Sequence, residues 1–361
     1  MDDILPLEPL HEEAGARFGV VAGRRVPRDY GDAAGEYDAV RRGAGLADRA
    51  DRVPLRVYGR DPVKMIQGLV TNDVAGAPEG QGVYAAMLTP KGKMVADVRI
   101  FRRPGGELWM DVDAAALEGV LAHLRKYVPP LFARVEELGS RLHVLGVYGP
   151  RSRDVLARAL GAAPPAGMAD EAVAEQRFDG AEVLVVRTGY VGEEGYDVFV
   201  PVASVASLWR ALQGAGARPV GHEALEVLRI EAGVPRWGAE LDESVIPLEA
   251  GLRERAISTT KGCYTGQEVI IRILHRGHVN RHLRGLRLGA APVPAAGTAL
   301  VRPADGKPAG RITSACYSPL HEQTIALGYV RREVEPPAVL RLGTADGPAA
   351  EVLELPIPIG A

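Results

Sequence analysis

Cysteine is scarce in this sequence, which has only Cys263 and Cys316 among its 361 residues. The two stand far apart, and neither belongs to a CxxC pair or to the Cys and His spacing of a zinc finger. A disulfide framework and an internal four-cysteine metal cluster are therefore excluded. A metal shared with a partner protein stays open, because a single thiolate can supply one ligand.

A strong net charge and a long apolar run are also missing. Forty-three basic residues stand against 46 acidic ones, which gives a formal charge of -3. No stretch approaches the roughly 18 uninterrupted apolar residues of a membrane span, and the N-terminal segment has no basic region followed by an apolar core. These absences predict a cytoplasmic protein that neither enters a membrane nor binds nucleic acid directly.

The remaining composition is that of a globular protein with more than one hydrophobic core. Apolar residues make up 47% of the chain, and 43 glycines and 27 prolines interrupt it with turns. A chain of this length exceeds what one core usually supports, so we expect two or three domains.

The order of predicted elements indicates two α+β modules followed by a β domain. Residues 94 to 101 and 107 to 112 predict a hairpin, and residues 113 to 128 predict a helix. A similar mixture of strands and helices recurs between residues 141 and 213. After Gly289, short alternating stretches predict a small all-β barrel or sandwich with strands at 298 to 301, 309 to 314, 325 to 330, 338 to 342 and 350 to 355.

The stretch RTGYVGEEGYDVF, residues 187 to 199, places three glycines after a predicted strand. The spacing is GxxGxxG and another strand follows, so no helix N-terminus would face a phosphate and a dinucleotide loop is disfavoured. Three glycines suit a tight hairpin. Tyr190, Glu193, Glu194 and Asp197 could hold a planar ligand that forms hydrogen bonds, or the carboxylates could be solvated turn residues.

The stretch KGCYTGQE, residues 261 to 268, sets Cys263 between Gly262 and Gly266. Glycine permits tight turning, which predicts an exposed thiol in a loop or at a helix start. Lys261 precedes the cysteine and a run of Arg and His follows it; such cations lower the pKa of a thiol when the fold brings them near. These features favour a functional thiol, whereas Cys316, on a predicted barrel strand, is assigned to packing.

Several of these stretches resemble a known family. KGCYTGQE is similar to the signature of YgfZ-type folate-binding proteins, which support the assembly or repair of iron–sulfur clusters, and IQGLVTNDV, residues 66 to 74, resembles a second stretch of theirs. The wider superfamily is that of aminomethyltransferase, the T-protein of the glycine cleavage system. It is similar in TGYVGEEGYD, LRIEAGVPRWGAELDE and ALGYV, at residues 188 to 197, 228 to 243 and 326 to 330.

The resemblance covers about residues 37 to 332 and implies a fold. That fold is an α+β cloverleaf of two ferredoxin-like, T-protein-type domains with a C-terminal β-barrel. The implied first domain comprises residues 1 to 52 and 138 to 250, and the second comprises residues 53 to 137. The KGCYTGQE linker would span 251 to 282 and the barrel 283 to 361.

The resemblance also implies a pocket for tetrahydrofolate or a one-carbon derivative of it. Tyr190 and Asp197 match the aromatic and acidic positions that contact the pterin, and Arg229 matches the arginine of the superfamily's LRLEAG element. In the signature stretch, the remaining residues would support Cys263; these are Lys261, Gly262, Tyr264, Gly266, Gln267 and Glu268. The implied partners besides folate are iron–sulfur assembly or client proteins. Cys263 could bind iron transiently, exchange with a partner disulfide or attack a folate-borne one-carbon unit.

The catalytic aspartate of T-proteins lies in a paired DD that aligns here with Ala96 and Asp97. An alanine at the catalytic position would disfavour aminomethyl transfer, whereas a shift of one residue would restore Asp97 to that role. The leading hypothesis is therefore a tetrahydrofolate-binding accessory factor for iron–sulfur proteins that uses Cys263. The alternatives are a folate-dependent aminomethyl or one-carbon transferase, and a non-catalytic scaffold with a vestigial pocket.

Overall fold

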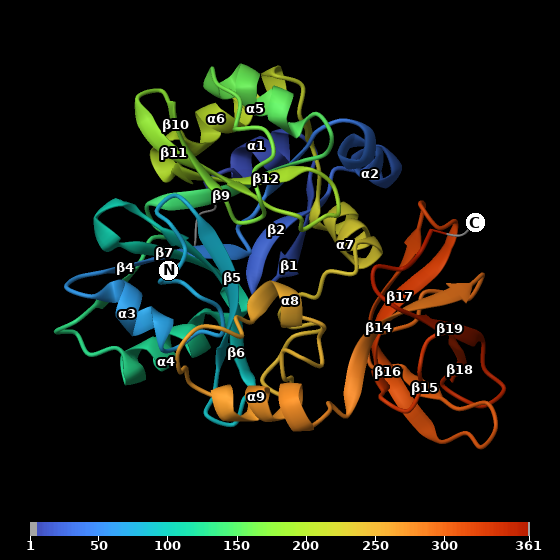
Figure 1. Ribbon diagram of the computed structural model, residues 1–361. Coiled ribbons are helices and arrows are strands. Elements are labelled where there is room, and N and C mark those ends of the chain that lie inside the picture. The colour runs from blue at the N-terminus through green and yellow to red at the C-terminus, as the bar shows by residue number, and fades with distance from the viewer. Residues whose placement is uncertain (1–5, 360–361) are drawn as a thin grey trace. The chain divides into compact units, whose positions relative to one another are not determined.

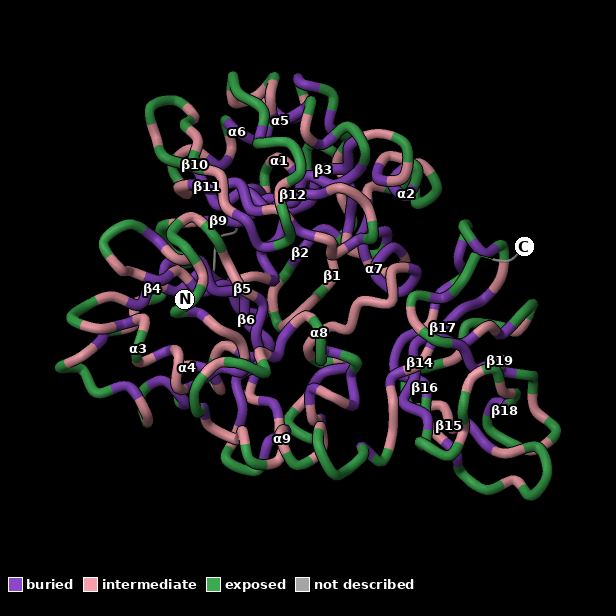
Figure 2. The backbone as a smooth tube through the Cα atoms, viewed as in Figure 1, coloured by how far each residue is buried: buried purple, intermediate pink, exposed green. Residues whose placement is uncertain are grey.

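The computed structural model describes residues 6 to 359, which form two compact units. Unit 1 comprises the described residues up to Met87, together with Val95–Leu225 and Ala256–Thr265. Unit 2 comprises Leu88–Met94, Glu226–Arg255 and the described residues from Gly266 onward. In both units the buried residues concentrate in the strands, and the connecting loops are mostly exposed (Figure 2).

Unit 1 contains a six-stranded sheet that carries helices on one face (Figure 1). Its strands, in sheet order, are β10 (Val173–Phe178), β11 (Ala181–Arg187), β12 (Gly195–Pro201), β9 (Leu142–Tyr148), β3 (Gly45–Asp48) and β13 (Arg218–Pro219). The helices α5 (Ser152–Leu160) and α6 (Val202–Gly214) bury Val155, Leu156, Leu208 and Trp209 against apolar side chains of this sheet. The remaining elements of this half are α1 (Glu8–Glu13), α2 (Ala33–Arg42) and the hairpin of β1 (Arg17–Val21) and β2 (Arg24–Asp29).

A five-stranded antiparallel sheet forms the other half of unit 1. Its strands, in sheet order, are β5 (Gly82–Leu88), β6 (Met94–Arg102), β7 (Leu108–Asp113), β4 (Arg52–Tyr58) and β8 (Arg134–Glu137). Two helices, α3 (Pro62–Gln67) and α4 (Leu117–Tyr127), accompany it, with short 3-10 turns at Pro104–Gly106 and Ala114–Ala116. Phe101 of β6 packs with Val144, Leu184, Val186 and Phe199 of the six-stranded sheet, so the two sheets meet face to face.

Unit 2 is dominated by a closed barrel of six strands. They run in the order β14 (Arg281–Gly289), β17 (Gln323–Arg331), β16 (Pro308–Ser318), β15 (Ala299–Val301), β18 (Ala338–Leu342) and β19 (Ala349–Leu353). β19 pairs with β14 and closes the ring. Leu286, Leu300, Ile312, Ala326 and Val352 belong to the apolar core. The helix α7 (His222–Glu231) crosses the boundary between the units, and α8 (Arg253–Ala256) and α9 (Gln267–Arg276) follow it along the chain.

The predicted fold class is confirmed, including the C-terminal barrel. The predicted hairpin around RRPGG forms, because Gly105 and Gly106 both adopt the positive φ that the turn requires. The bounds of its strands differ from the predicted ones by one residue. The sixth barrel strand, β14, was not predicted, since its RHLRGLRLG sequence lies in the basic run that follows KGCYTGQE. Within the described residues, no helix combines the length and the apolar character needed to cross a bilayer.

Candidate folate and thiol sites

One face of the five-stranded sheet is apolar, whereas the other carries charged side chains beside Phe101. Arg99 of β6 lies opposite Asp111 of β7, and Arg52 of β4 lies opposite Asp113. Because residues directly opposite in a ladder point to the same face, these four side chains share one side of the sheet. They meet the six-stranded sheet within unit 1, where Arg99 reaches Asp197.

Side-chain alternation along β6 separates Ala96 from Asp97. Ala96 is fully buried and shares a face with Met94, Val98 and Ile100, all of which are fully buried as well. Asp97 lies two residues before Arg99 and therefore points to the charged face. Of the two residues that align with the paired aspartates, only Asp97 shares a face with Arg52, Arg99, Asp111 and Asp113. We call these five residues, together with Asp197, Arg49 and Tyr190 of the six-stranded half, the charged cluster.

Arg99 joins the two sheets of unit 1. Its Nε donates to Asp111 Oδ2 over 2.7 Å, and its Nη1 lies 2.6 Å from Asp197 Oδ2. Burial alone would raise the pKa of Asp111, but the guanidinium groups of Arg52 and Arg99 outweigh burial and lower it. Asp111 is therefore ionised, and the pair holds Arg99 in place for Asp197.

Asp197 and Tyr190, the two residues predicted to contact a pterin, are connected through Arg49. Asp197 is buried and accepts a hydrogen bond of 2.6 Å from the Tyr148 hydroxyl. Arg49 donates to the same hydroxyl over 2.7 Å, grips Asp51 with two hydrogen bonds of 2.9 Å, and lies with its Cζ 4.5 Å from the centre of the Tyr190 ring. The aromatic face and the carboxylate thus belong to one cluster.

Asp97 keeps one carboxylate oxygen without a hydrogen-bond partner among the described residues. Its Oδ2 accepts from the Tyr84 hydroxyl over 3.1 Å, whereas its Oδ1 is buried and unpaired. Continuing the β6–β7 register by one residue places Asp97 opposite Asp113. Burial, with help from the charges of Asp51 and Asp97, raises the pKa of Asp113 to about 6 against the opposing effect of Arg52. Two buried carboxyl groups therefore face each other, and one of them has an unused acceptor.

The other carboxylates of the Gly-rich hairpin have partners within the protein. Glu193 forms an ion pair of 2.7 Å with Arg41, and Glu194 accepts from the Tyr196 hydroxyl over 2.7 Å. These contacts position the loop around Tyr190.

Arg229 lies in unit 2 and is fully buried. Its five N–H donors have five protein acceptors: two on Glu226, one on Glu240, the carbonyl of Val234 and the hydroxyl of Ser314. A folate contact by Arg229 stays a prediction, and it would require one of these bonds to be exchanged.

The KGCYTGQE and IQGLVTNDV stretches contact each other in unit 1 through Lys261. Its Nζ donates to the backbone carbonyls of Gln67, Val70 and Asn72 over 2.6, 2.7 and 3.0 Å. Thr265 N donates to Gly68 O over 3.0 Å, and burial lowers the pKa of Lys261 to about 8. The lysine anchors the loop, since all three of its N–H donors have carbonyl acceptors.

Cys263 is exposed in this anchored loop, as its glycine neighbours predicted, and it is a free thiol. Gly262 is exposed beside it, while Tyr264 on its other side is buried. Cys316 is buried on β16, and burial raises the pKa of its thiol to about 12. The two cysteines therefore differ in access and in the ease with which a thiolate forms.

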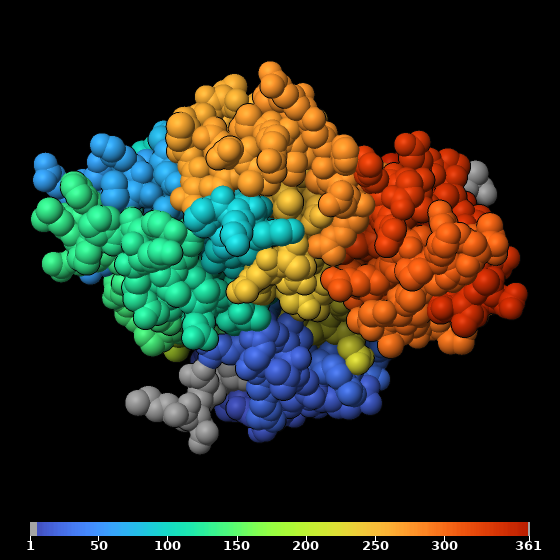
Figure 3. Space-filling view, turned by 90° about the horizontal axis from the view of Figure 1, so that it is seen from below, coloured from blue at the N-terminus to red at the C-terminus, as the bar shows by residue number. Residues whose placement is uncertain are grey.

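The end of KGCYTGQE begins helix α9 in unit 2. Gly266 precedes the helix with φ of 81°, and a Cβ there would lie 2.6 Å from Thr89 O, so only glycine fits. Gln267 and Glu268 form the first turn, and Glu268 is exposed. A Cβ on Gly92 would lie 2.8 Å from Val269 Cβ, so the turn between β5 and β6 packs on α9, as the cyan and orange segments show in Figure 3.

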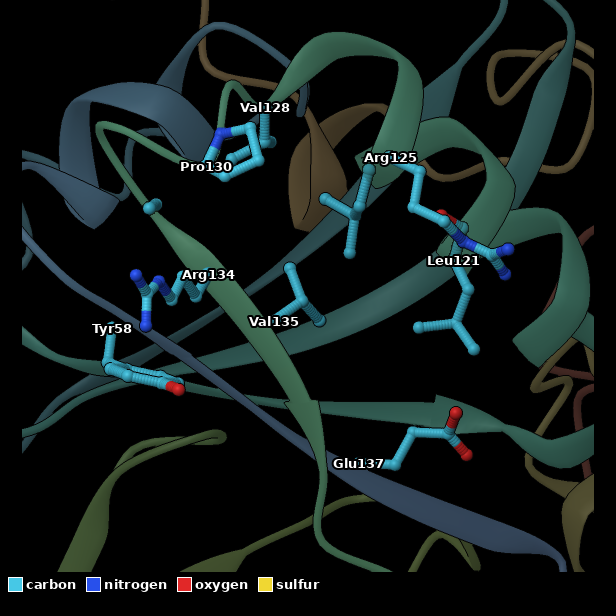
Figure 4. A pocket seen from close by; sticks show the side chains of 10 residues that line it. Tyr58, Leu121, Arg125, Val128, Pro130, Arg134, Val135 and Glu137 are labelled. Atoms are coloured by element: carbon cyan, nitrogen blue, oxygen red, sulfur yellow. The ribbon is translucent and has the colours of Figure 1, made fainter.

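A separate cavity of about 660 Å³ lies between α4 and β8, lined by apolar side chains such as Leu121 and Val135 with Arg125 and Arg134 nearby (Figure 4). It shares no lining residue with the charged cluster. The described residues contain no group of three or more His, Cys, Asp or Glu side chains that could hold a metal ion.

Four residues of this site were not predicted from the sequence: Arg49, Tyr84, Arg99 and Asp113. A usable signal was present in MVADVRIF and MDVD, where charged residues recur at alternate positions of otherwise apolar strands. That spacing places two charges on one face of each strand, and two such strands in one hairpin predict a buried charged cluster.

Comparison with known proteins assigns the chain to a family. Residues 7–261 match the GCVT N-terminal domain, and residues 281–356 match the glycine cleavage T-protein C-terminal barrel domain. The aminomethyltransferases of Rubrobacter xylanophilus and Geobacillus kaustophilus are 35% and 32% identical, over 91% of this chain and 87% and 90% of theirs. The crystal structure of the glycine cleavage system aminomethyltransferase T of Bartonella henselae superposes with a TM-score of 0.88 at 27% identity, over 98% of this chain and 97% of that one. The chain therefore belongs to the glycine cleavage T-protein family.

Proposed function

We propose that the charged cluster of unit 1 binds tetrahydrofolate and that the protein transfers a one-carbon unit, such as an aminomethyl group, with Asp97 beside the reacting atoms. The observation that carries this proposal is the buried Oδ1 of Asp97, which has no hydrogen-bond partner among the described residues and lies on the face that holds Arg99, the partner of Asp197. The relatives named aminomethyltransferase support the same chemistry. This ranks the transferase hypothesis ahead of the iron–sulfur one.

The residues of the cluster fit a pterin. The pyrimidine ring of a tetrahydropterin is flat and carries hydrogen-bond donors along one edge, so it needs an aromatic or guanidinium surface and carboxylate acceptors. Tyr190 and Arg49 would supply the surface, and Asp97 Oδ1 would supply an acceptor that no described residue uses. Tetrahydrofolate, when bound, supplies the nitrogen atoms that accept the one-carbon unit.

In this reaction Asp97 would accept a proton, and Asp113 would hold one. Asp97 Oδ1 can accept a proton from a reacting amine, because its hydrogen bond from Tyr84 uses only Oδ2. The raised pKa of Asp113 allows that group to hold a proton near pH 6 and thereby to relieve the repulsion between the two carboxylates.

Asp97→Asn tests this role. We expect turnover with tetrahydrofolate and an aminomethylated carrier protein to fall by at least about 100-fold, since a positioned base typically contributes that much. Tetrahydrofolate affinity, measured by anaerobic calorimetry, should change only a few-fold, roughly the effect of one altered hydrogen bond. Asp154→Asn, which removes an exposed carboxylate from α5, is the matched control and should change neither. Normal turnover by Asp97→Asn, or no folate binding by the wild type, would refute the proposal.

A second candidate function is support of iron–sulfur proteins by Cys263. It is favoured by the exposure of this thiol on a loop that Lys261 anchors, within the most specific stretch of the resemblance. Because the described residues lack a three-ligand group, an iron ion held by Cys263 would need ligands from a partner.

Complementation separates the two candidates. A strain that lacks the gene would receive the wild type, Cys263→Ser, Cys316→Ala or Asp97→Asn, and the activity of an iron–sulfur enzyme would be measured. Loss of rescue by Cys263→Ser alone would support the second candidate. Full rescue by Cys263→Ser would eliminate a thiol role in iron–sulfur support.

A further inference from the structure

A cavity of about 420 Å³ in unit 2 lies between the turn after α7 and the barrel strand β16. Its walls are partly apolar, with Pro294, Ala296 and Ile312 among the lining residues. Three charged side chains also line it: Glu226, Arg236 and Arg311.

Arg236 reaches the cavity with its hydrogen-bonding capacity largely unused. Its Nε is buried and makes no hydrogen bond among the described residues, and the nearest carboxylate oxygen, on Glu226, is 3.5 Å away. Its Nη1 makes one long contact of 3.5 Å with the carbonyl of Trp237. A buried N–H without an acceptor costs free energy, so this guanidinium favours an acceptor in the cavity.

Arg311 supplies a second guanidinium from β16. Its side chain is exposed and forms no ion pair or side-chain hydrogen bond with any described residue. The irregularity in the β16–β17 register between Ile312 and Ser314 lies directly after it. The two arginines thus come from separate elements and line the same cavity.

Glu226 does not neutralise both arginines, because Arg229 already holds it. Arg229 donates to Glu226 Oε2 over 2.7 Å and to Oε1 over 2.5 Å. Those bonds are shorter than the 3.5 Å separation between Glu226 and Arg236. The lining therefore presents two guanidinium groups and one carboxylate that is committed elsewhere.

We propose that this cavity is a binding site for a small oxyanion, a carboxylate or a phosphate, held between Arg236 and Arg311. The planar fork of a guanidinium matches both chemistries with paired N–H donors. Part of the wall is apolar, which suits an organic dicarboxylate with a short hydrocarbon chain. The site is separate from the charged cluster of unit 1 and does not depend on folate.

Calorimetric titration of the whole protein tests the site, with succinate and inorganic phosphate as the two probes at constant ionic strength. We expect saturable binding by the wild type, weakened at least about tenfold by Arg311→Ala, since loss of one charge-assisted contact has roughly that effect. Arg311→Lys keeps the charge but loses the fork, and should lie between the two. Arg332→Ala removes an exposed guanidinium from the same barrel outside the cavity and is the matched control.

Tighter binding of succinate would identify the carboxylate as the ligand class, and tighter binding of phosphate would identify the phosphate. Equal weakening by Arg311→Ala and Arg332→Ala would show a general charge effect and overturn the proposal. Heat that never saturates would show an adventitious ion only, and would overturn it as well. Because no folate or carrier protein is present, these outcomes are independent of the proposed transferase activity.

Discussion

Arg229 in unit 2 and Asp97 in unit 1 are both buried charged residues, but their surroundings differ in one respect. Arg229 has a protein acceptor for each of its five N–H donors. Asp97 has a donor for one oxygen and none, among the described residues, for the other. A buried charge whose hydrogen bonds are complete stabilises its surroundings, whereas an incomplete one retains the capacity to bind a ligand.

This comparison predicts the largest loss of stability for Arg229→Ala. Removal of the guanidinium leaves Glu240, which is fully buried, without its ion-pair partner. We expect the free energy of unfolding in urea to fall by about 3–5 kcal/mol. Arg332→Ala, at an exposed position, should change it by less than about 0.5 kcal/mol. A loss of that small size for Arg229→Ala would contradict the view that its bonds are complete.

The pH dependence of the free energy of unfolding, compared between wild type and Asp113→Asn, tests the surroundings of Asp97 further. The folded pKa of about 6 lies above the ordinary value of 3.8, so the folded protein binds this proton more tightly than the unfolded chain does between those values. The contribution of Asp113 to the free energy of unfolding is therefore greatest below pH 4 and is lost as pH rises through 6. The free energy of unfolding of the wild type should therefore fall, relative to that of Asp113→Asn, by about 2–3 kcal/mol between pH 4 and pH 7. A difference that is constant across this range would show that burial in the folded protein does not raise the pKa of Asp113.

Lys261→Met should have a smaller and more local effect. The change removes three hydrogen bonds to backbone carbonyls, and we expect a loss of about 1–2 kcal/mol because the side chain is only partly buried. Hydrogen exchange at the amides of Thr265 and Ser258, which bond to Gly68 and Thr71, would report loosening of the loop. Lys64→Met, on the exposed side of α3, is the control and should leave both amides protected.

The smallest effect, and one of opposite sign, is expected for Asp97→Asn. The variant keeps an acceptor for Tyr84 and removes a negative charge opposite Asp113. We expect the free energy of unfolding at pH 7 to rise by up to about 1 kcal/mol, since opposed like charges destabilise a strand pair. A fall of more than about 1 kcal/mol would place Asp97 with Arg229 among the residues whose bonds are complete.

Most elements of the fold could be predicted from the sequence, because helices, strands and turns depend on short local patterns of residues. The hairpin at 94 to 102 and 108 to 113 follows from apolar runs around a Gly-containing turn, and the barrel strands follow from alternation between turns. β14 was not predicted because its alternating arginines and leucines continue a run of basic residues, so the two-residue alternation of a strand was not recognised there. The order of strands in each sheet depends on contacts between distant segments, which no local pattern encodes.

Fewer residues of the candidate site could be predicted from the sequence. Tyr190, Asp197 and Cys263 were named from motifs, and their roles stay predictions. The choice between Ala96 and Asp97 could not be made without knowing which face of β6 meets the second sheet. Arg49 and Asp113 lie just outside the predicted motifs. The pairing of β6 with β7 brings Asp113 opposite Asp97, and the fold of the six-stranded sheet brings Arg49 to Tyr190.

The closure of the barrel has a consequence for the order in which unit 2 folds. Gly285 on β14 pairs with Leu353 on β19, so the first strand is completed only by the last. Until β19 is in place, both of those strands expose unpaired backbone groups to any neighbouring chain. Such a long-range pairing is slow to form. Unit 2 should therefore be most vulnerable to aggregation late in folding, just before the ring closes.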